Sequence, residues 1–200
     1  MNVSLSRNRN DSRKVRSFLY QIYFNELQWS PPADNPSGWK VEEGTTDQPR
    51  FIDNFENQAK WIWVSDDDEN ILSCCRLITP IEKKLEYELY TPAMIEIESD
   101  SSKIELNRFA INHKLLNTNL PLKMLYSALE FCTLEKKHFL VIPTPEVIYE
   151  YCVKLGFHCS SHAPFKYSDT DPDSIKLVYL DLQDKVHIEK VRREWRDLLR

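Results

Sequence analysis

The segment from Ile104 to Ile111 constrains this chain most, because it combines the pattern of a buried strand with two charged side chains. Apolar residues at 104, 106, 109 and 111 predict that the segment lies largely inside the protein. Glu105 and Arg108 interrupt them, and a buried charge is costly unless it is paired or used in chemistry. A further arginine, Arg76, lies in the earlier apolar run 72–78. These two predicted strands are therefore where we look for a functional site.

The composition is that of a globular protein. The 42% of hydrophobic residues can fill a core, and a length of 200 residues favours one domain over two. The net charge of -5 argues against general affinity for nucleic acids, which requires a basic surface. Only three glycines are present, so a Walker loop and a Rossmann fingerprint are excluded, because both need clustered glycines. We expect a single domain over residues 1–200 with no nucleic-acid partner.

The location is predicted from what the chain lacks. No run approaches the roughly 18 consecutive apolar residues of a membrane span, and residues 1–7 lack the apolar core of a signal peptide. The five cysteines are an odd number without a C-x-x-C pair, which suits free thiols in a reducing compartment. We expect a cytoplasmic protein with no integral membrane segment.

Apolar periodicity and breaker residues predict an alternation of strands and helices. The predicted strands are 61–64, 71–78, 103–111, 139–142 and 175–182. The predicted helices are 11–28, a helix that begins near Asn119 and Pro121, a helix capped by Thr144 that stops at Gly156, and 186–199. Residues 30–50 are predicted to be a long loop, either disordered or a lid over a site. The expected fold is α+β, an α/β three-layer domain whose mixed, mostly antiparallel sheet is flanked by helices.

Two groups of potential metal ligands are assigned no metal. The acidic run 66–70 lacks the glycine and the spaced ligands of a calcium loop, so we interpret it as a solvated hairpin tip. His158, Cys159 and His162 lie close together, but no second pair of ligands accompanies them. No metal site is expected.

The order of elements from residue 103, with a helix ending in Lys154-Leu155-Gly156-Phe157, resembles the GNAT acyltransferase superfamily. The resemblance implies that the loop after the strand binds the pyrophosphate of a pantetheine carrier at a helix N-terminus. The residues implied for this role are Ile111, Asn117, Thr118, Asn119 and Leu120. The family's loop is rich in glycine, whereas this one has none, which favours an acyl carrier protein over free CoA as the donor. Cys152 replaces the tyrosine that many members carry four residues before the glycine, and we interpret it as a core cysteine.

Residues 13–112 more narrowly resemble the acyl-homoserine lactone synthases and the N-acyl amino acid synthases. The first helix ends at Trp29, as the family's first helix ends at a tryptophan. Asp53-Asn54-Phe55-Glu56 is similar to the family's D-x-F-D, and Arg76-Leu77-Ile78-Thr79-Pro80 to its R-L-x-P-T. Glu105-Leu106-Asn107-Arg108-Phe109 is similar to E-x-S-R-F, with Asn in place of Ser. The order of the four elements carries the resemblance.

This resemblance implies an N-acyltransferase that moves a fatty acyl group from an acyl carrier protein, or from acyl-CoA, to the amine of an amino acid or a homoserine-lactone-type substrate. The phosphopantetheine-linked donor is then a cosubstrate, and no cofactor is permanently bound. The candidate catalytic residues are Glu105, Asp53 and Glu56. The candidate substrate-binding residues are Trp29, Arg76, Arg108, Phe109 and Thr144.

Alternatives stay open for several roles. Glu105 either receives the ammonium proton, because a carboxylate in an apolar strand has a raised pKa, or pairs with an arginine across the sheet. Arg76 and Arg108 either hold a substrate carboxylate or lactone, or order Asp53 and Glu56; the resemblance implies the second. Other readings of the whole chain are an acyl-CoA-dependent GNAT acetyltransferase acting on a small amine or protein, and a GNAT-like binding domain that has lost catalysis.

Overall fold

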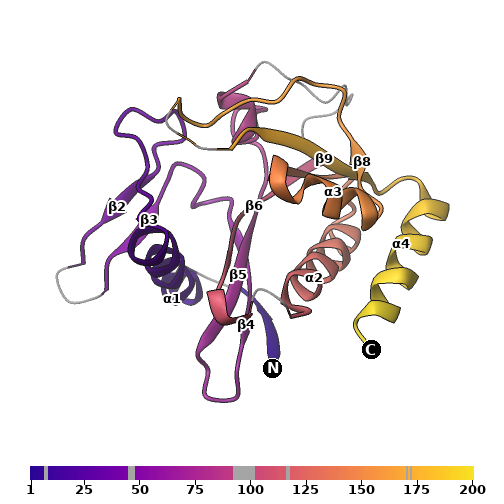
Figure 1. Cartoon of the computed structure of the whole chain (residues 1–200), viewed down its shortest axis with the longest axis horizontal. Helices are drawn as coiled ribbons and strands as arrows, with labels where there is room; N and C mark the ends of the chain where they lie inside the picture. The colour runs from indigo at the N-terminus through magenta and orange to yellow at the C-terminus, as the bar shows by residue number, and fades with distance from the viewer. Residues whose placement is uncertain (7–8, 45–47, 92–101, 116–117, 170, 172) are drawn as a thin grey trace.

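In a computed structural model, a seven-stranded sheet lies between two groups of helices (Figure 1). The structure describes all residues except 7–8, 45–47, 92–101, 116–117, 170 and 172. The strands of this sheet are β1 (Asn2–Leu5), β4 (Lys60–Ser65), β5 (Ile71–Ile78), β6 (Lys103–Ile111), β7 (Phe139–Pro145), β8 (His158–Cys159) and β9 (Ile175–Asp181). They are ordered β1-β4-β5-β6-β7-β9-β8, and only the β6–β7 pair is parallel. The expected mixed, mostly antiparallel sheet is thus confirmed.

Helices cover both faces of the sheet. The helices are α1 (Arg9–Tyr20), α2 (Leu120–Leu134), α3 (Glu146–Lys154) and α4 (Lys185–Leu198). One face carries α1 together with a separate two-stranded ladder of β2 (Lys40–Glu42) and β3 (Arg50–Ile52), and the other face carries α2, α3 and α4 (Figure 1). Apolar residues from each helical layer pack against alternate residues of β4 and β5, such as Trp61 and Ile62. The three-layer α+β architecture follows from this two-sided burial.

The first helix differs from its prediction in the second half. α1 continues into a π-helical turn, Gln21–Glu26. Val15 and Leu19 are buried, but Leu27, which the predicted helix 11–28 would place on the same apolar stripe, is 65% exposed. A π turn holds more residues than an α turn, so the side chains after it no longer follow the α-helical stripe. The turn directs Tyr23 toward β6, where its hydroxyl donates a hydrogen bond to the Phe109 carbonyl at 3.0 Å.

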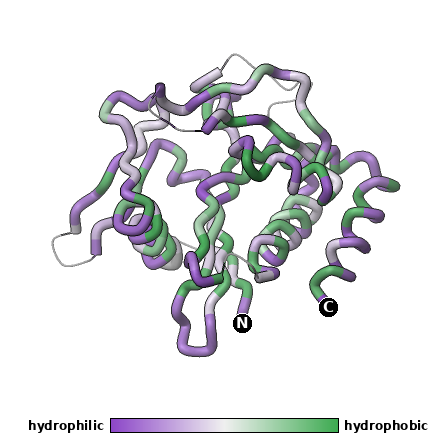
Figure 2. The backbone as a smooth tube through the Cα atoms, viewed as in Figure 1, coloured by the Kyte–Doolittle hydropathy of each residue, from purple (hydrophilic) through white to green (hydrophobic). Residues whose placement is uncertain are grey.

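Several local predictions can be compared directly with the structure. The β4–β5 hairpin ends in a hydrophilic tip, in which the Asp66 carboxylate accepts hydrogen bonds from the backbone of Asp68 and Asn70 (Figure 2). Thr144 was expected to cap α3, but that is wrong: Thr144 is the sixth residue of β7, and Pro145 stands at the helix boundary. Gly156 ends the α3 region at φ +93° as expected, and a Cβ there would lie 2.8 Å from Val191.

Four short strands escaped prediction: β1, β2, β3 and β8 have four residues or fewer, too few to show a period. β2 lies inside the segment that was predicted to be an irregular loop up to residue 50, and β3 begins at its last residue. In the described part of the chain, no helix has the length and apolar character required to cross a membrane.

Candidate functional site

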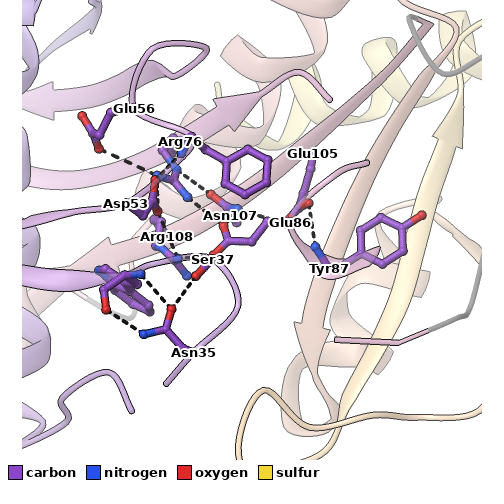
Figure 3. A network of polar contacts seen from close by, with 12 residues as sticks. Asn35, Ser37, Asp53, Glu56, Arg76, Glu86, Tyr87, Glu105, Asn107 and Arg108 are labelled. Atoms are coloured by element: carbon purple, nitrogen blue, oxygen red, sulfur yellow. Dashed lines mark hydrogen bonds and ion pairs between the residues drawn. The ribbon is translucent and has the colours of Figure 1, made fainter. Parts of the chain in front are cut away.

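Arg76 is the centre of a buried ionic network on the α1 face of the sheet (Figure 3). Its side chain is 1% exposed, and all three of its nitrogens donate hydrogen bonds. Nε binds Asn107 Oδ1 at 3.0 Å, Nη1 binds Asp53 Oδ2 at 2.6 Å, and Nη2 binds Glu86 Oε2 at 2.8 Å. The planar guanidinium thereby joins β5, the segment after β3 and the segment after β5.

A β-bulge places two consecutive residues of β6 in this network. Cys74 pairs with Ala110 and Arg76 pairs with Asn107, so one residue of β5 faces two residues of β6. Arg108 is one of these two, and its φ of +52° is unusual for a residue other than glycine. The bulge turns the Arg108 side chain to the same face as Asn107, although neighbours in a regular strand alternate.

Arg108 closes the network on its second side. Its Nη2 donates to Glu86 and, at 3.3 Å, to Asp53 Oδ2. The guanidinium carbon lies 3.3 Å from the centroid of the Trp39 ring, a cation–π contact. Burial alone would lower the pKa of Arg108, but Glu86 and Asp53 outweigh it and raise this pKa, so the group stays charged.

Glu105 is fully enclosed below these groups. Its Oε1 accepts from the Asn107 amide at 2.8 Å, and its Oε2 accepts from the backbone N–H of Tyr87 at 3.2 Å. Burial and the nearby charge of Glu86 raise the pKa of Glu105 to about 8. This carboxyl group therefore binds a proton more tightly than an exposed glutamate does.

Asp53 and Glu56 form the outer rim. Glu56 pairs with Arg16 at 3.0 Å and lies 3.8 Å from Arg76. Burial raises the pKa of Glu56 despite these cations. Burial would also raise the pKa of Asp53, but Arg76 and Arg108 outweigh it and hold that pKa below its usual value. Two carboxylates of the same rim thus differ in proton affinity.

The network is close to electrical balance. Its charged members are the four carboxyl groups of Asp53, Glu56, Glu86 and Glu105 and the three guanidinium groups of Arg16, Arg76 and Arg108. With Glu105 protonated and the other six groups ionised, negative and positive charges are equal in number. Loss of the Glu105 proton leaves one net negative charge in a buried site.

Five of the predicted site residues meet in this network: Asp53, Glu56, Arg76, Glu105 and Arg108. Trp29 does not contact the network directly but packs on Trp39, the ring that contacts Arg108; the centroids of the two tryptophan rings are 4.4 Å apart. Phe109 and Thr144 lie outside the network: Phe109 packs against the core beneath α2, and the Thr144 hydroxyl lies 3.9 Å from the thiol of Cys152.

The residue that sequence reasoning missed is Glu86. It binds both arginines and the Asn107 amide, yet it precedes a 3₁₀ helix, Tyr87–Leu89, in a polar stretch with no strand pattern. Glu88 in the same stretch binds the buried Lys103 at 3.1 Å. Both glutamates reach residues of β6, but the spacing of residues in this stretch does not indicate it.

Two hollows border the rim. A surface pocket of about 340 Å³ is lined by Ala33, Asn35, Gly38, Trp39, Lys40, Ile52, Asp53 and Asn54. A narrow crevice beside it is lined by Leu19, Trp39, Phe51, Ile52, Asp53, Glu56, Trp61, Arg76 and Arg108. Asn35 fixes the wall between them, because its amide donates to the Trp39 carbonyl and accepts from the Trp39 N–H, both at 2.7 Å. Glu105 lines neither hollow.

The network lies where two strands separate. β6 and β7 pair at three positions, and the last of these joins Glu105 to Val141. Among the described residues of both strands, no pair follows, although β6 runs on to Ile111 and β7 to Pro145. Beyond Glu105 the two strands therefore no longer pair with each other.

The predicted donor loop lies at the start of α2. Thr118 accepts from the Leu120 N–H at 3.4 Å, and the Asn119 amide donates to the Leu198 carbonyl at 3.3 Å instead of capping its own helix. Ile111 ends β6 opposite Ser73. Asn117 lies outside the described residues. Within the described ranges, no three His, Cys, Asp or Glu side chains are grouped so that they could hold a metal ion.

No protein-family model and no curated protein sequence matches this chain, whereas solved structures do. MesI, a CoA-dependent acyl-homoserine lactone synthase, matches at 18% identity and a TM-score of 0.66, over 97% of this chain and 95% of its own. FeeM, an N-acyl amino acid synthase from uncultured soil microbes, matches at 15% identity and a TM-score of 0.66, over 92% of this chain and 91% of its own. A GNAT-family acetyltransferase from Staphylococcus aureus Mu50 matches at 14% identity and a TM-score of 0.56, over 90% of this chain and 99% of its own.

This chain has their fold. The motif-based resemblance to GNAT acyltransferases and to the two narrower groups is therefore confirmed at the level of the fold. At such identities, the likeness leaves donor and acceptor to be argued from the site.

Proposed function

We propose that this chain, as one domain over residues 1–200, is an N-acyltransferase. It moves a fatty acyl group from a phosphopantetheine thioester to the amine of an amino acid or a homoserine-lactone-type substrate. One observation carries the proposal: the ionic network lies at the point where β6 and β7 part, so that Glu105 is both a network member and the last paired residue of β6. MesI and FeeM, which share the fold, are named for acyl transfer to such acceptors.

The gap between the strands suits an acyl thioester. A thioester carbonyl develops negative charge when an amine attacks it, and fixed backbone N–H groups stabilise that charge. Backbone N–H groups beyond Glu105 and Val141 do not pair between β6 and β7, and we assign them this purpose. The pantetheine arm then extends toward Thr118, Asn119 and Leu120 at the start of α2, where N–H groups favour a phosphate.

The amine side needs a base, because an ammonium ion cannot attack a carbonyl. The pKa of Glu105, about 8, lies close to the value of about 7.7–8.0 of an α-amino group, so proton transfer between them is nearly balanced. Glu105 is enclosed, so a water molecule carries the proton to it. Asp53 and Glu56 at the rim hold and orient the amine.

We propose an acyl carrier protein as the donor, because the loop before α2 has no glycine; Lys114 and Lys123 lie beside it and can meet an acidic partner. MesI is CoA-dependent, so acyl-CoA is the alternative donor. The five free thiols fit activity in the cytoplasm.

The test is thiol release by the purified chain from acyl carrier protein and from acyl-CoA donors, with a panel of amines and mass analysis of the product. We expect an N-acyl product, and at least a hundredfold loss in Glu105→Gln. Glu88→Gln is the matched control, because Glu88 is a buried glutamate of an ion pair outside the network. Turnover of acetyl-CoA alone would favour a GNAT acetyltransferase, and no turnover with any donor would contradict the proposal.

A further inference from the structure

The backbone at Arg108 needs an anchor that the ion pairs of its side chain do not supply. Its φ of +52° is left-handed, which is unfavourable for a residue with a Cβ, and the bulge of Arg108 and Phe109 interrupts the ladder between β5 and β6. The ion pairs with Asp53 and Glu86 fix only the guanidinium group. Since an arginine side chain has many rotamers, contacts at its tip are compatible with more than one backbone conformation.

Tyr23 contacts the bulge directly. Its hydroxyl donates a hydrogen bond of 3.0 Å to the carbonyl of Phe109, the second bulge residue, so the bond acts on the backbone immediately after Arg108. Burial raises the pKa of Tyr23 to about 12, and the hydroxyl therefore keeps the proton that it donates. One hydrogen bond and one left-handed residue are of similar magnitude in free energy. This contact is therefore strong enough to decide the conformation of the bulge.

The π-helical turn Gln21–Glu26 holds Tyr23 in this position. The Leu27 N–H donates to the Ile22 carbonyl at 3.0 Å, five residues back, which is the hydrogen bond of a π turn. The Trp29 N–H then donates to the Tyr23 carbonyl at 2.8 Å. The backbone and the hydroxyl of Tyr23 are thus both fixed, one to the end of the turn and the other to β6.

The ring of Tyr23 supports Arg108 by a second route. Its centroid lies 5.8 Å from that of Trp39, and the Trp39 centroid lies 3.3 Å from the guanidinium carbon of Arg108. The two routes can be separated by experiment. A change of Tyr23 to phenylalanine keeps the ring and its packing and removes only the hydroxyl that binds the bulge.

We propose that Tyr23 is a positioning residue of the site, whose hydroxyl holds the bulge and thereby keeps the Arg108 guanidinium group over Trp39 and beside Asp53. Burial would raise the pKa of Asp53, but Arg76 and Arg108 outweigh it. Through Arg108, Tyr23 thus helps to keep charged a carboxylate to which it donates no hydrogen bond. The effect on turnover rests on the proposed function, in which Asp53 holds the amine, whereas the control of Arg108 does not.

The first experiment observes Arg108 in the protein without substrates. Arginine is labelled with ¹⁵N, and the Arg108 Nε–H signal is assigned as the one missing from Arg108→Lys. This N–H is buried and makes no hydrogen bond with the described residues, so its proton shift reports mainly the Trp39 ring, which shields protons above its face. We expect an upfield signal in the parent and a return toward the usual arginine position in Tyr23→Phe.

Tyr20→Phe is the matched control. Tyr20 ends α1 and packs on the same Phe51 ring as Tyr23, and within the described part of the chain its hydroxyl makes no hydrogen bond. The Arg108 signal should therefore stay in place in Tyr20→Phe. Unfolding would collapse the spread of all amide signals, so it is distinguishable from the movement of one arginine signal.

The second experiment measures acyl transfer at saturating donor. Tyr23→Phe should raise KM for the amine about fivefold, as expected for the loss of one hydrogen bond, and should change kcat less. In an Arg108→Ala background, Tyr23→Phe should add no further effect, because the residue through which it acts is absent.

The outcomes of the two experiments are separate. An Arg108 signal that stays in place in Tyr23→Phe, or that moves equally in Tyr20→Phe, would overturn the positioning role. An equal rise in KM with and without the Arg108 side chain would overturn the route through Arg108. A moved Arg108 signal in a parent protein that transfers no acyl group would support the positioning role and contradict the proposed function.

Discussion

Asn107 and Arg108 are neighbours in β6, yet their side chains lie on the same face of the sheet and bind the same carboxylate, that of Glu86. The bulge opposite Cys75 makes this possible. In a regular strand Arg108 would point toward α2, on the far side of the sheet from Asp53. The bulge at Arg108 therefore places two neighbouring side chains of β6 in the same ionic network.

The positive φ of Arg108 predicts that glycine is more stable than alanine at this position, the reverse of the usual order inside a strand. Alanine at φ +52° carries a left-handed penalty of about 1–2 kcal/mol that glycine avoids. We expect Arg108→Gly to unfold at a higher urea concentration than Arg108→Ala, since both lack the side chain. At Ala110, a buried residue of the same strand, Ala110→Gly should instead lower stability by about 0.5–1 kcal/mol or more. The opposite order at residue 108 would argue against the bulge.

Removal of Arg76 leaves Asp53 and Glu86 as buried charges with fewer partners. We expect Arg76→Met to lower the free energy of unfolding by about 3–5 kcal/mol, as for other broken buried ion pairs. Lys190→Met, at a 62% exposed side chain, should change it by less than about 0.5 kcal/mol. Equal effects in urea denaturation would mean that the network adds nothing beyond a surface contact.

Glu105 should make the protein less stable as the pH rises. Its pKa is about 8 in the folded chain and about 4.3 when unfolded, so between these values the folded state binds more protons. Its stabilising contribution is complete below pH 4 and is lost as the pH rises to about 8. Glu105→Gln should therefore gain stability relative to the parent on going from pH 5 to pH 8, measured by urea unfolding across that range. A constant difference between the two proteins would show that Glu105 titrates normally.

Glu86 should control the proton affinity of Glu105. The Glu86 charge helps to raise the pKa of Glu105, so Glu86→Gln should lower that pKa. Carboxyl ¹³C titration by NMR would follow it, with Glu88→Gln as the control that leaves the Glu105 curve in place. An upward shift in Glu86→Gln would reverse the electrostatic argument.

The sequence predicted the parts of the site that lie on regular strands. β5 and β6 have the bounds 71–78 and 103–111 that periodicity indicates, and their charged residues stand out against an apolar background. Glu86 could not be found in this way, because it lies among polar residues and becomes buried only through tertiary contacts. The bulge was equally hidden, since nothing in the residue type of Arg108 announces a positive φ.

The aromatic side chains beside the network, Trp29 and Trp39, were predicted only in part. Trp29 was expected at the amine site, but Trp39, in the supposed irregular loop, is the ring that touches Arg108. Its position depends on the hydrogen bonds of Asn35 to its backbone, which are local turn contacts without a periodic signal.

Because Arg76 is enclosed, the ion pairs around it should respond to salt differently from the ion pairs on the surface of this protein. Ions in solution screen exposed pairs such as Lys190–Glu194 on α4, whose contribution fades as ionic strength rises. They do not enter a site in which Arg76, Asp53 and Glu86 are each about 1% exposed. High ionic strength should therefore weaken the ion pairs of the network much less than the exposed ion pairs at the surface of the same molecule.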